Sequence, residues 1–197
     1  MKKLFIILFV FCAANTFAQK KVADYHSDYW EKDYEICITT AKNDPSTLSE
    51  IYIDVAGERS SETVTLNYES PVLLLSSLKE VREKYAEWIK VAEENNITEM
   101  RKEIPVNMPA VTVCWYTSKW HLSSKRRFKF DFLILDSGKK IIVMNEKVVS
   151  SANQYIDTEF YWVFQSVTEL DEFIENLDYS KFIEKLNAKA NSADLFQ

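Results

Sequence analysis

The clearest structural signal in this 197-residue sequence is the stretch Ser77–Ile89, SLKEVREKYAEWI. Its apolar residues recur mostly three or four positions apart, the spacing that places side chains on one face of a helix. Ser77 and Glu80 have the spacing of a capping box, in which the serine oxygen accepts from the third helical amide. We therefore predict a long middle helix from Leu78 to about Glu94 that packs on a sheet. Its apolar stripe consists of Leu78, Val81, Tyr85, Trp88, Ile89 and Ala92.

Short segments rich in β-branched and aromatic residues lie on both sides of this helix and predict strands. They span 34–41, 51–55, 63–68 and 72–76 before the helix, and 111–117, 128–135, 141–145 and 160–165 after it. Between them we expect irregular connections, notably over 43–46, 96–109 and 146–157. A second capping box, Ser166 with Glu169, precedes a short helix, and Asp178 can cap another. The predicted fold class is α+β: antiparallel sheets in two clusters, the long middle helix and two short C-terminal helices.

The order of strands followed by a capped helix occurs twice, which suggests an internal duplication with half-repeats 33–95 and 110–178. The segments 37–42 and 114–119 match at three of six positions, and 77–83 matches 166–172 at three positions. Recurrence in the same order is what distinguishes a repeat from a chance match. Capping boxes and Thr-rich strands are also common enough to align by chance, so both readings stay open.

This repeated order of elements is similar to the Whirly family of single-stranded DNA binders. The similarity lies in the inferred topology across most of the chain, and no motif residue of that family can be matched in this sequence. It therefore implies an arrangement of sheets and helices and transfers no site residue, because fold analogy alone does not establish function.

The N-terminus has the three parts of an export signal. Met1–Lys3 is positive, Leu4–Ala14 is an apolar run of eleven residues, and Thr16–Ala18 is a small-x-small cleavage site before Gln19. The ending Ala18-Gln19 resembles that of exported proteins of Bacteroidetes. We predict that 1–18 is a signal peptide and that 19–197 is a single domain, periplasmic or secreted. The alternative for the apolar run is a buried strand. No segment reaches the length of about 20 residues that a membrane span needs.

Cys37 and Cys114 remain once the predicted leader is removed. An even number of cysteines in an oxidising compartment allows one disulfide, here closing a loop of 78 residues. The alternative is two buried free thiols, because cysteine is among the most buried residue types. The chain contains no Cys-x-x-Cys pair, no paired-histidine motif and only two glycines. We therefore expect no metal and no cofactor.

Charge is distributed unevenly along the chain, whose overall net charge is −6. Residues 101–150 hold ten Lys or Arg against four Asp or Glu, whereas the rest of the predicted mature chain is acidic. A basic stretch interleaved with rings could bind an anionic glycan or an acidic protein, since arginine forks pair with carboxylates and rings stack on sugars. The alternative is a solvated surface that offsets acidic neighbours. Export and net acidity make nucleic acid an unexpected partner. The candidate ligand-binding residues are Lys119, Trp120, His121, Lys125, Arg126, Arg127 and Lys129.

Signals for catalysis are weak. Cys114 and His121 could form a nucleophile pair, but a cysteine in an apolar strand disfavours the thiolate. Asp131 and Asp136 could serve a glycosidase, although Asp136 is better explained as a turn residue. We expect a non-catalytic binding protein and identify no catalytic residue. A glycan- or peptide-directed hydrolase and a structural component of a surface assembly are the alternatives. Aromatic residues near the N-terminus could stack on a polysaccharide or simply pack: Tyr25, Tyr29, Trp30 and Tyr34.

Overall fold

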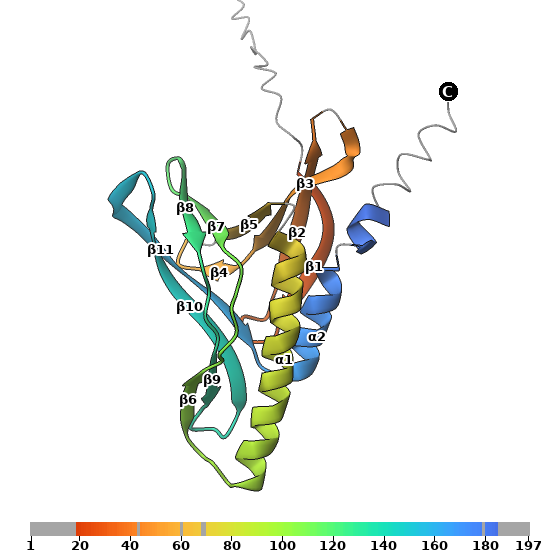
Figure 1. The fold of residues 1–197 in the computed structure, drawn as a ribbon. Coiled ribbons are helices and arrows are strands. Elements are labelled where there is room, and N and C mark those ends of the chain that lie inside the picture. Colours follow the sequence, from red (N-terminus) through yellow and green to blue (C-terminus); the bar gives the residue numbers. More distant parts are fainter. Residues whose placement is uncertain (1–18, 43, 60, 68–69, 179, 185–197) are drawn as a thin grey trace, which may run out of the picture.

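The structure is a computed structural model, and it describes residues 19–42, 44–59, 61–67, 70–178 and 180–184. The predicted leader 1–18 lies outside these residues. Within them the chain forms two antiparallel sheets packed with the helices α1 (Ser70–Glu94) and α2 (Val167–Asn176) (Figure 1). This is a mixed α and β arrangement with two sheets, as the sequence predicts. Neither of these two helices combines the length and the apolar composition needed to cross a bilayer.

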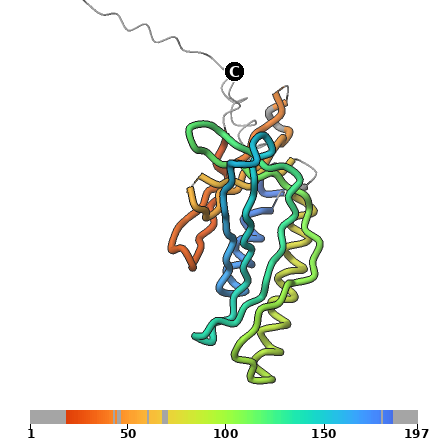
Figure 2. The backbone as a smooth tube through the Cα atoms, turned by 90° about the vertical axis from the view of Figure 1, so that its left-hand side faces the viewer, coloured from red at the N-terminus to blue at the C-terminus, as the bar shows by residue number. Residues whose placement is uncertain are grey.

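Sheet A has six strands in the spatial order β1-β2-β3-β5-β7-β8. They are β1 (Lys20–Ser27), β2 (Lys32–Ala41), β3 (Asp44–Asp54), β5 (Thr63–Asn67), β7 (Val111–Tyr116) and β8 (Trp120–Arg126). Sheet B has five strands in the order β4-β11-β10-β9-β6. They are β4 (Ala56–Gly57), β6 (Met100–Glu103), β9 (Asp131–Ile134), β10 (Lys140–Ser150) and β11 (Asn153–Phe164). Figures 1 and 2 show the C-terminal turns of α1 and the β9–β10 connection projecting together at one end of the molecule.

Side chains alternate between two environments along the strands, as the period of two in an extended backbone requires. One continuous core contains buried residues from both sheets and both helices. Sheet A contributes Ile36, Ile38, Ile51, Ile53, Val64, Leu66, Val113 and Trp115, and sheet B contributes Phe132, Ile134, Ile142, Met144, Phe160, Trp162 and Phe164. The residues of sheet A that lie between these core positions point to the opposite face, where the candidate site is found.

The helix α1 begins at Ser70, eight residues before the predicted start. The predicted strand 72–76 is therefore wrong, and so is the capping box: the Ser77 hydroxyl lies inside the helix and donates to the main-chain oxygen of Asn107 at 2.9 Å. Leu74 is buried four positions before Leu78, so the apolar stripe simply continues one turn further toward the N-terminus. Pro71 is compatible with this start, because the first turn of a helix leaves its amides unpaired.

Three predicted connections are partly strand. The polar segment 146–157 forms the distal part of the β10–β11 hairpin, whose pairs run from Ile142 and Phe164 to Val149 and Asp157. Buried and exposed residues alternate along these strands. The exposed positions can be polar because the strands pair through main-chain hydrogen bonds, and this polarity is why the segment resembles a connection in the sequence. Met100–Glu103, expected to be irregular, pairs with β9, and β3 begins at Asp44 inside the predicted turn 43–46. Asn43 lies outside the described residues.

The serine half of the second capping box is confirmed, whereas the Glu169 carboxylate accepts from the amides of Gln165 and Asp28 rather than from that of Ser166. The Ser166 side chain accepts from the Glu169 amide at 3.0 Å, at the start of α2. After α2, residues 180–184 are helical, and Asp178 accepts from the Ser180 amide at 3.0 Å as a cap should. Arg82 of α1 and Asp171 of α2 form two hydrogen bonds of 2.8 Å, which join the two helices.

The two predicted half-repeats do not each form a sheet. β7 and β8, from the second half, extend the sheet made by β2, β3 and β5, whereas β4, from the first half, pairs with β11. The boundary between the sheets therefore differs from the boundary between the halves, and the duplication stays a prediction.

Candidate functional site

The basic stretch 119–129 does not form one surface. Lys119 and Trp120 are exposed at the β7–β8 turn, and the Trp120 side chain is 65% exposed. His121 is buried, with its Nε2 2.9 Å from the Thr117 hydroxyl and its ring packed on Trp115. Both Trp120 and His121 line one depression, but the lysines and arginines of the stretch do not reach it.

The remaining cations of this stretch are largely engaged by the protein itself. Arg126 pairs with Glu146 at 2.5 Å and Lys129 pairs with Glu103 at 2.8 Å. Arg127 donates to the main-chain oxygen of Met108 at 3.3 Å, and Lys125 is exposed at the end of β8. Acidic neighbours thus offset much of the charge of the stretch, as the alternative interpretation of its sequence expects.

The outer face of sheet A is hollowed instead. Three adjoining depressions, of about 360, 370 and 460 Å³, begin on this outer face beside β7 and β8 and continue past the ends of β2 and β3 to the junction with β4 and β11. The last depression is lined by Lys32 and Tyr34, which lie on the same side of β2 as the core residues Ile36 and Ile38. The middle depression shares Glu35, Asp54, Thr63 and Trp120 with the first, and Lys32, Tyr34 and Val55 with the last. We call this continuous surface the sheet A trough. Its principal side chains are Trp30, Lys32, Tyr34, Glu35, Cys37, Tyr52, Asp54, Trp120 and Tyr161.

Two carboxylates lie at the middle of the trough. The register of β2 with β3 pairs Cys37 with Tyr52, so Glu35 and Asp54 are the next neighbours on the same face. Burial and the nearby charge of Glu35 raise the pKa of Asp54, while a hydrogen bond of 3.0 Å from the Thr63 hydroxyl opposes that rise. On the other side, Lys21 lies 3.1 Å from Glu35. The pair can accept several hydrogen bonds from a ligand.

Aromatic rings lie beside these carboxylates and at one end of the trough. Trp120 lines the same two depressions as Glu35 and Asp54, and Trp30 packs against Tyr161 with ring centroids 5.8 Å apart at the end near β4 and β11. The Tyr52 hydroxyl donates to Glu50 at 2.5 Å, and burial together with this contact raises the pKa of Tyr52 to about 12. The phenol therefore stays neutral near pH 7 and offers its ring as a contact surface.

Cys37 and Cys114 both reach the trough, but they are free thiols, so the disulfide that the sequence allows is wrong. Strands β3 and β5 lie between β2 and β7, and three inter-strand steps span roughly 14 Å. A disulfide needs Cα atoms within about 7 Å. Burial raises the pKa of both thiols, which disfavours the reactive thiolate. Cys114 and His121 line the same depression, but among the described contacts the Cys114 thiol lies 3.7 Å from the Thr65 hydroxyl and the His121 ring contacts Thr117, so no hydrogen bond of a nucleophile pair joins them.

Sequence reasoning singled out several residues of the trough for other reasons, but it did not predict the trough itself. These residues are Trp30, Tyr34, Cys37, Cys114, Trp120 and His121. A signal was present: Glu35, Cys37, Tyr52 and Asp54 alternate with buried isoleucines in two predicted strands. That pattern identifies the outward positions of each strand, but only the sheet order shows that they adjoin.

The described residues contain no group of three or more His, Cys, Asp or Glu side chains arranged to hold a metal ion. No family model matches the chain, and neither the curated proteins nor the solved structures include a match.

Proposed function

We propose that this protein is a non-catalytic binding protein that holds an extended, neutral glycan in the sheet A trough. The observation that carries the proposal is the continuity of the trough, whose three depressions share lining residues from one end to the other. An elongated surface that runs from one face of a sheet past its end suits a chain-like ligand better than a compact one, which needs a single enclosed pocket.

The lining chemistry supports a polyhydroxylated ligand. Rings at Trp30, Tyr52 and Trp120 offer flat apolar faces on which a sugar ring can lie. Glu35 and Asp54 between them can accept hydrogen bonds from hydroxyl groups, and such charge-assisted bonds are stronger than neutral ones.

The charge of the trough argues for a neutral ligand rather than the acidic glycan expected from the basic stretch. Its lining includes five carboxylates, whereas Lys32 is the only lysine or arginine among the described lining residues. Like charges brought together across an interface reduce affinity. The carboxylates are Asp33, Glu35, Asp54, Glu58 and Glu62.

The predicted leader 1–18 supports action in the periplasm or outside the cell, where polysaccharides are exposed to such a protein.

The test is a titration of the mature chain with neutral oligosaccharides (maltohexaose, cellohexaose and laminarihexaose) and with an acidic one, hexagalacturonate. We expect at least one neutral oligosaccharide to bind and hexagalacturonate to bind more weakly. Trp120→Ala should weaken binding about tenfold, because it removes one stacking surface. Tyr155→Ala is the matched control, since Tyr155 is 86% exposed on the β10–β11 hairpin and does not line the trough. Equal affinities of the two variants, or no binding to any neutral oligosaccharide, would contradict the proposal.

A glycan hydrolase is the second candidate, and one observation favours it. Asp54 has a raised pKa beside Glu35, and glycosidases use two neighbouring carboxyl groups of which one holds its proton. The release of reducing ends from the oligosaccharide that binds would distinguish the two functions. Catalysis by this pair predicts that Asp54→Asn abolishes release while it preserves binding. A binding protein predicts no release above buffer for the unmodified chain.

A further inference from the structure

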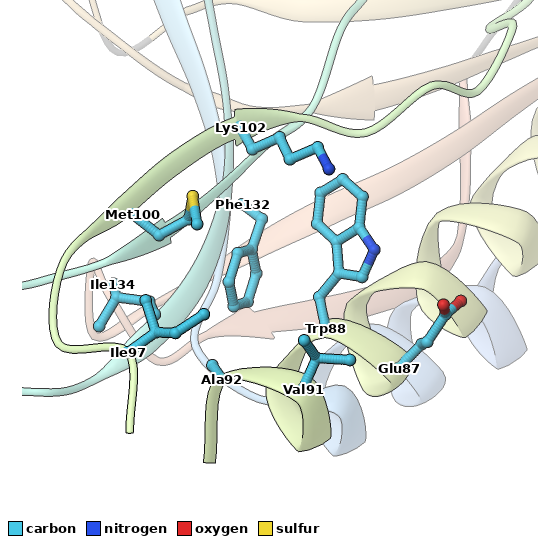
Figure 3. Close-up of a pocket in the computed structure, with 9 residues that line it drawn as sticks. All are labelled: Glu87, Trp88, Val91, Ala92, Ile97, Met100, Lys102, Phe132 and Ile134. Atoms are coloured by element: carbon cyan, nitrogen blue, oxygen red, sulfur yellow. The ribbon is translucent and has the colours of Figure 1, made fainter. Parts of the chain in front are cut away.

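We propose a second binding site, independent of the trough, that takes a medium-chain carboxylate. It is a cavity of about 290 Å³ between the C-terminal half of α1 and strands β6 and β9. Figure 3 shows its lining side chains, which come from α1, β6, β9 and, at Ile97, the connection between α1 and β6.

The floor of the cavity is apolar and belongs to the core. Phe132, Ile134 and Ala92 are almost fully buried, with exposed fractions of 2%, 5% and 4%. Trp88 crosses Phe132 edge to face, with ring centroids 5.8 Å apart. Ile97 completes the apolar lining close to Phe132 and Ile134 (Figure 3). A ligand that entered here would transfer its own apolar surface out of water against this lining.

One cation lies at the mouth. The Lys102 ammonium is 4.6 Å from the centroid of the Trp88 ring and points over it (Figure 3). Within the part of the chain that the structure describes, no carboxylate pairs with Lys102. Two nearby cations do have carboxylate partners: Arg101 pairs with Asp131, and Lys129 pairs with Glu103.

Among the described residues, the one carboxylate at the rim of the cavity, that of Glu87, does not pair with Lys102. Glu87 lies 2.7 Å from Lys84 of its own helix, and Figure 3 shows its carboxylate directed away from the apolar side chains. An apolar cavity with one uncompensated ammonium at its mouth is complementary to a ligand with an apolar body and one negative charge. Such a ligand can place its alkyl chain in the cavity and pair its carboxylate with Lys102. The Trp88 ring would then contact both the alkyl chain and the ammonium.

The size and the lining of the cavity favour a short amphiphile. A volume of about 290 Å³ lies at the lower end of the range of small-molecule sites, so we choose octanoate as the probe.

The experiment is isothermal titration of the mature chain with octanoate and with uncharged octanamide. We expect octanoate to bind with a Kd on the order of 0.1–1 mM, as befits a small ligand, and octanamide to bind several-fold more weakly. Lys102→Met should weaken octanoate binding about five- to tenfold and leave octanamide binding unchanged. Lys90→Met is the matched control, because it removes the same charge from the exposed surface of α1 outside the cavity.

A variant that fills the cavity tests the location. Ala92→Phe should abolish binding of both ligands, and thermal unfolding will establish that this variant is folded. If it does not fold, Val91→Trp at the 43% exposed rim replaces it. The proposal is overturned if octanoate does not bind, if octanamide binds as tightly, if Lys102→Met behaves as Lys90→Met does, or if the folded filled variant still binds octanoate.

Discussion

The indole nitrogen of Trp162 donates a hydrogen bond of 2.9 Å to the hydroxyl of Tyr25, and this hydroxyl donates to the main-chain oxygen of Asp54 at 2.9 Å. Both side chains are buried. The relay connects β11 of sheet B with β1 and β3 of sheet A, and it ends at the residue whose carboxylate lies in the trough. One phenol hydroxyl therefore links the two sheets at this point.

Tyr25→Phe should destabilise the protein by about 1–3 kcal/mol, because it leaves the Trp162 donor and the Asp54 main-chain acceptor without a partner in the core. The measurement is the free energy of unfolding in urea. Tyr155→Phe removes the same hydroxyl from an exposed residue and should change that free energy by less than about 0.5 kcal/mol. Equal losses in the two variants would show that the relay contributes nothing.

The Arg82–Asp171 pair should make stability depend on pH. The guanidinium holds the pKa of Asp171 below its usual range, so the carboxylate is favoured in the folded state. Its contribution is present above the unfolded pKa of about 3.9 and is lost as pH falls through the lower folded pKa. Both side chains are about two-fifths exposed, which limits the pair to roughly 1 kcal/mol or less. Asp171→Asn should lower the free energy of unfolding by this amount at pH 7. The difference in that free energy between the variant and the unmodified protein should vanish near pH 2, and urea titrations at the two pH values measure it.

His26 should titrate above the ordinary histidine pKa of about 6.5, because its Nδ1 lies 2.6 Å from the Asp33 carboxylate. The stabilising contact is complete below that value and is lost as pH rises through the raised pKa. Nuclear magnetic resonance titration of the ring protons measures the pKa, and His26→Gln assigns the signal. Asp33→Asn should lower the pKa of His26, and an unchanged value would contradict the geometry.

Cys37 and Cys114 should both react with a thiol reagent in the mature chain. In denaturant without reductant, we expect two thiols per chain, as the free cysteines require. Both side chains are only half-buried in the folded state, but their raised pKa values should make labelling slow near neutral pH. Mass spectrometry after maleimide treatment gives the count, and an unlabelled chain would indicate the disulfide that we exclude.

Several elements follow from local patterns. The apolar stripe from Leu78 to Ala92 and the Ser166–Glu169 cap depend on residues a few positions apart, so their spacing in the sequence is also their spacing in space. The start of α1 was missed because Ser77 and Glu80 have the spacing of a cap. The burial of Leu74 and the contact of Ser77 with Asn107 depend on partners that arrive only when the chain folds.

The candidate site shows the same division. The alternation of Glu35, Cys37, Tyr52 and Asp54 with isoleucine is readable from the chain, and the outward direction of each follows from the strand period of two. The sequence does not show which of these residues become neighbours in space, because strand order and register depend on contacts between distant segments. For the same reason, the partners of Arg126 and Lys129, which offset the basic stretch, came from β10 and β6.

Local spacing was enough to establish an α+β chain with amphipathic helices, outward-facing polar positions and a candidate export leader. Folding alone placed β7 beside β5 and kept the two cysteines three strands apart. It also joined carboxylates and rings of distant strands into one trough, and among the described residues it left Lys102 beside an apolar cavity with no carboxylate partner. The reason is that helix faces and strand alternation arise from the geometry of consecutive residues, whereas a binding surface arises from residues that only long-range packing brings together.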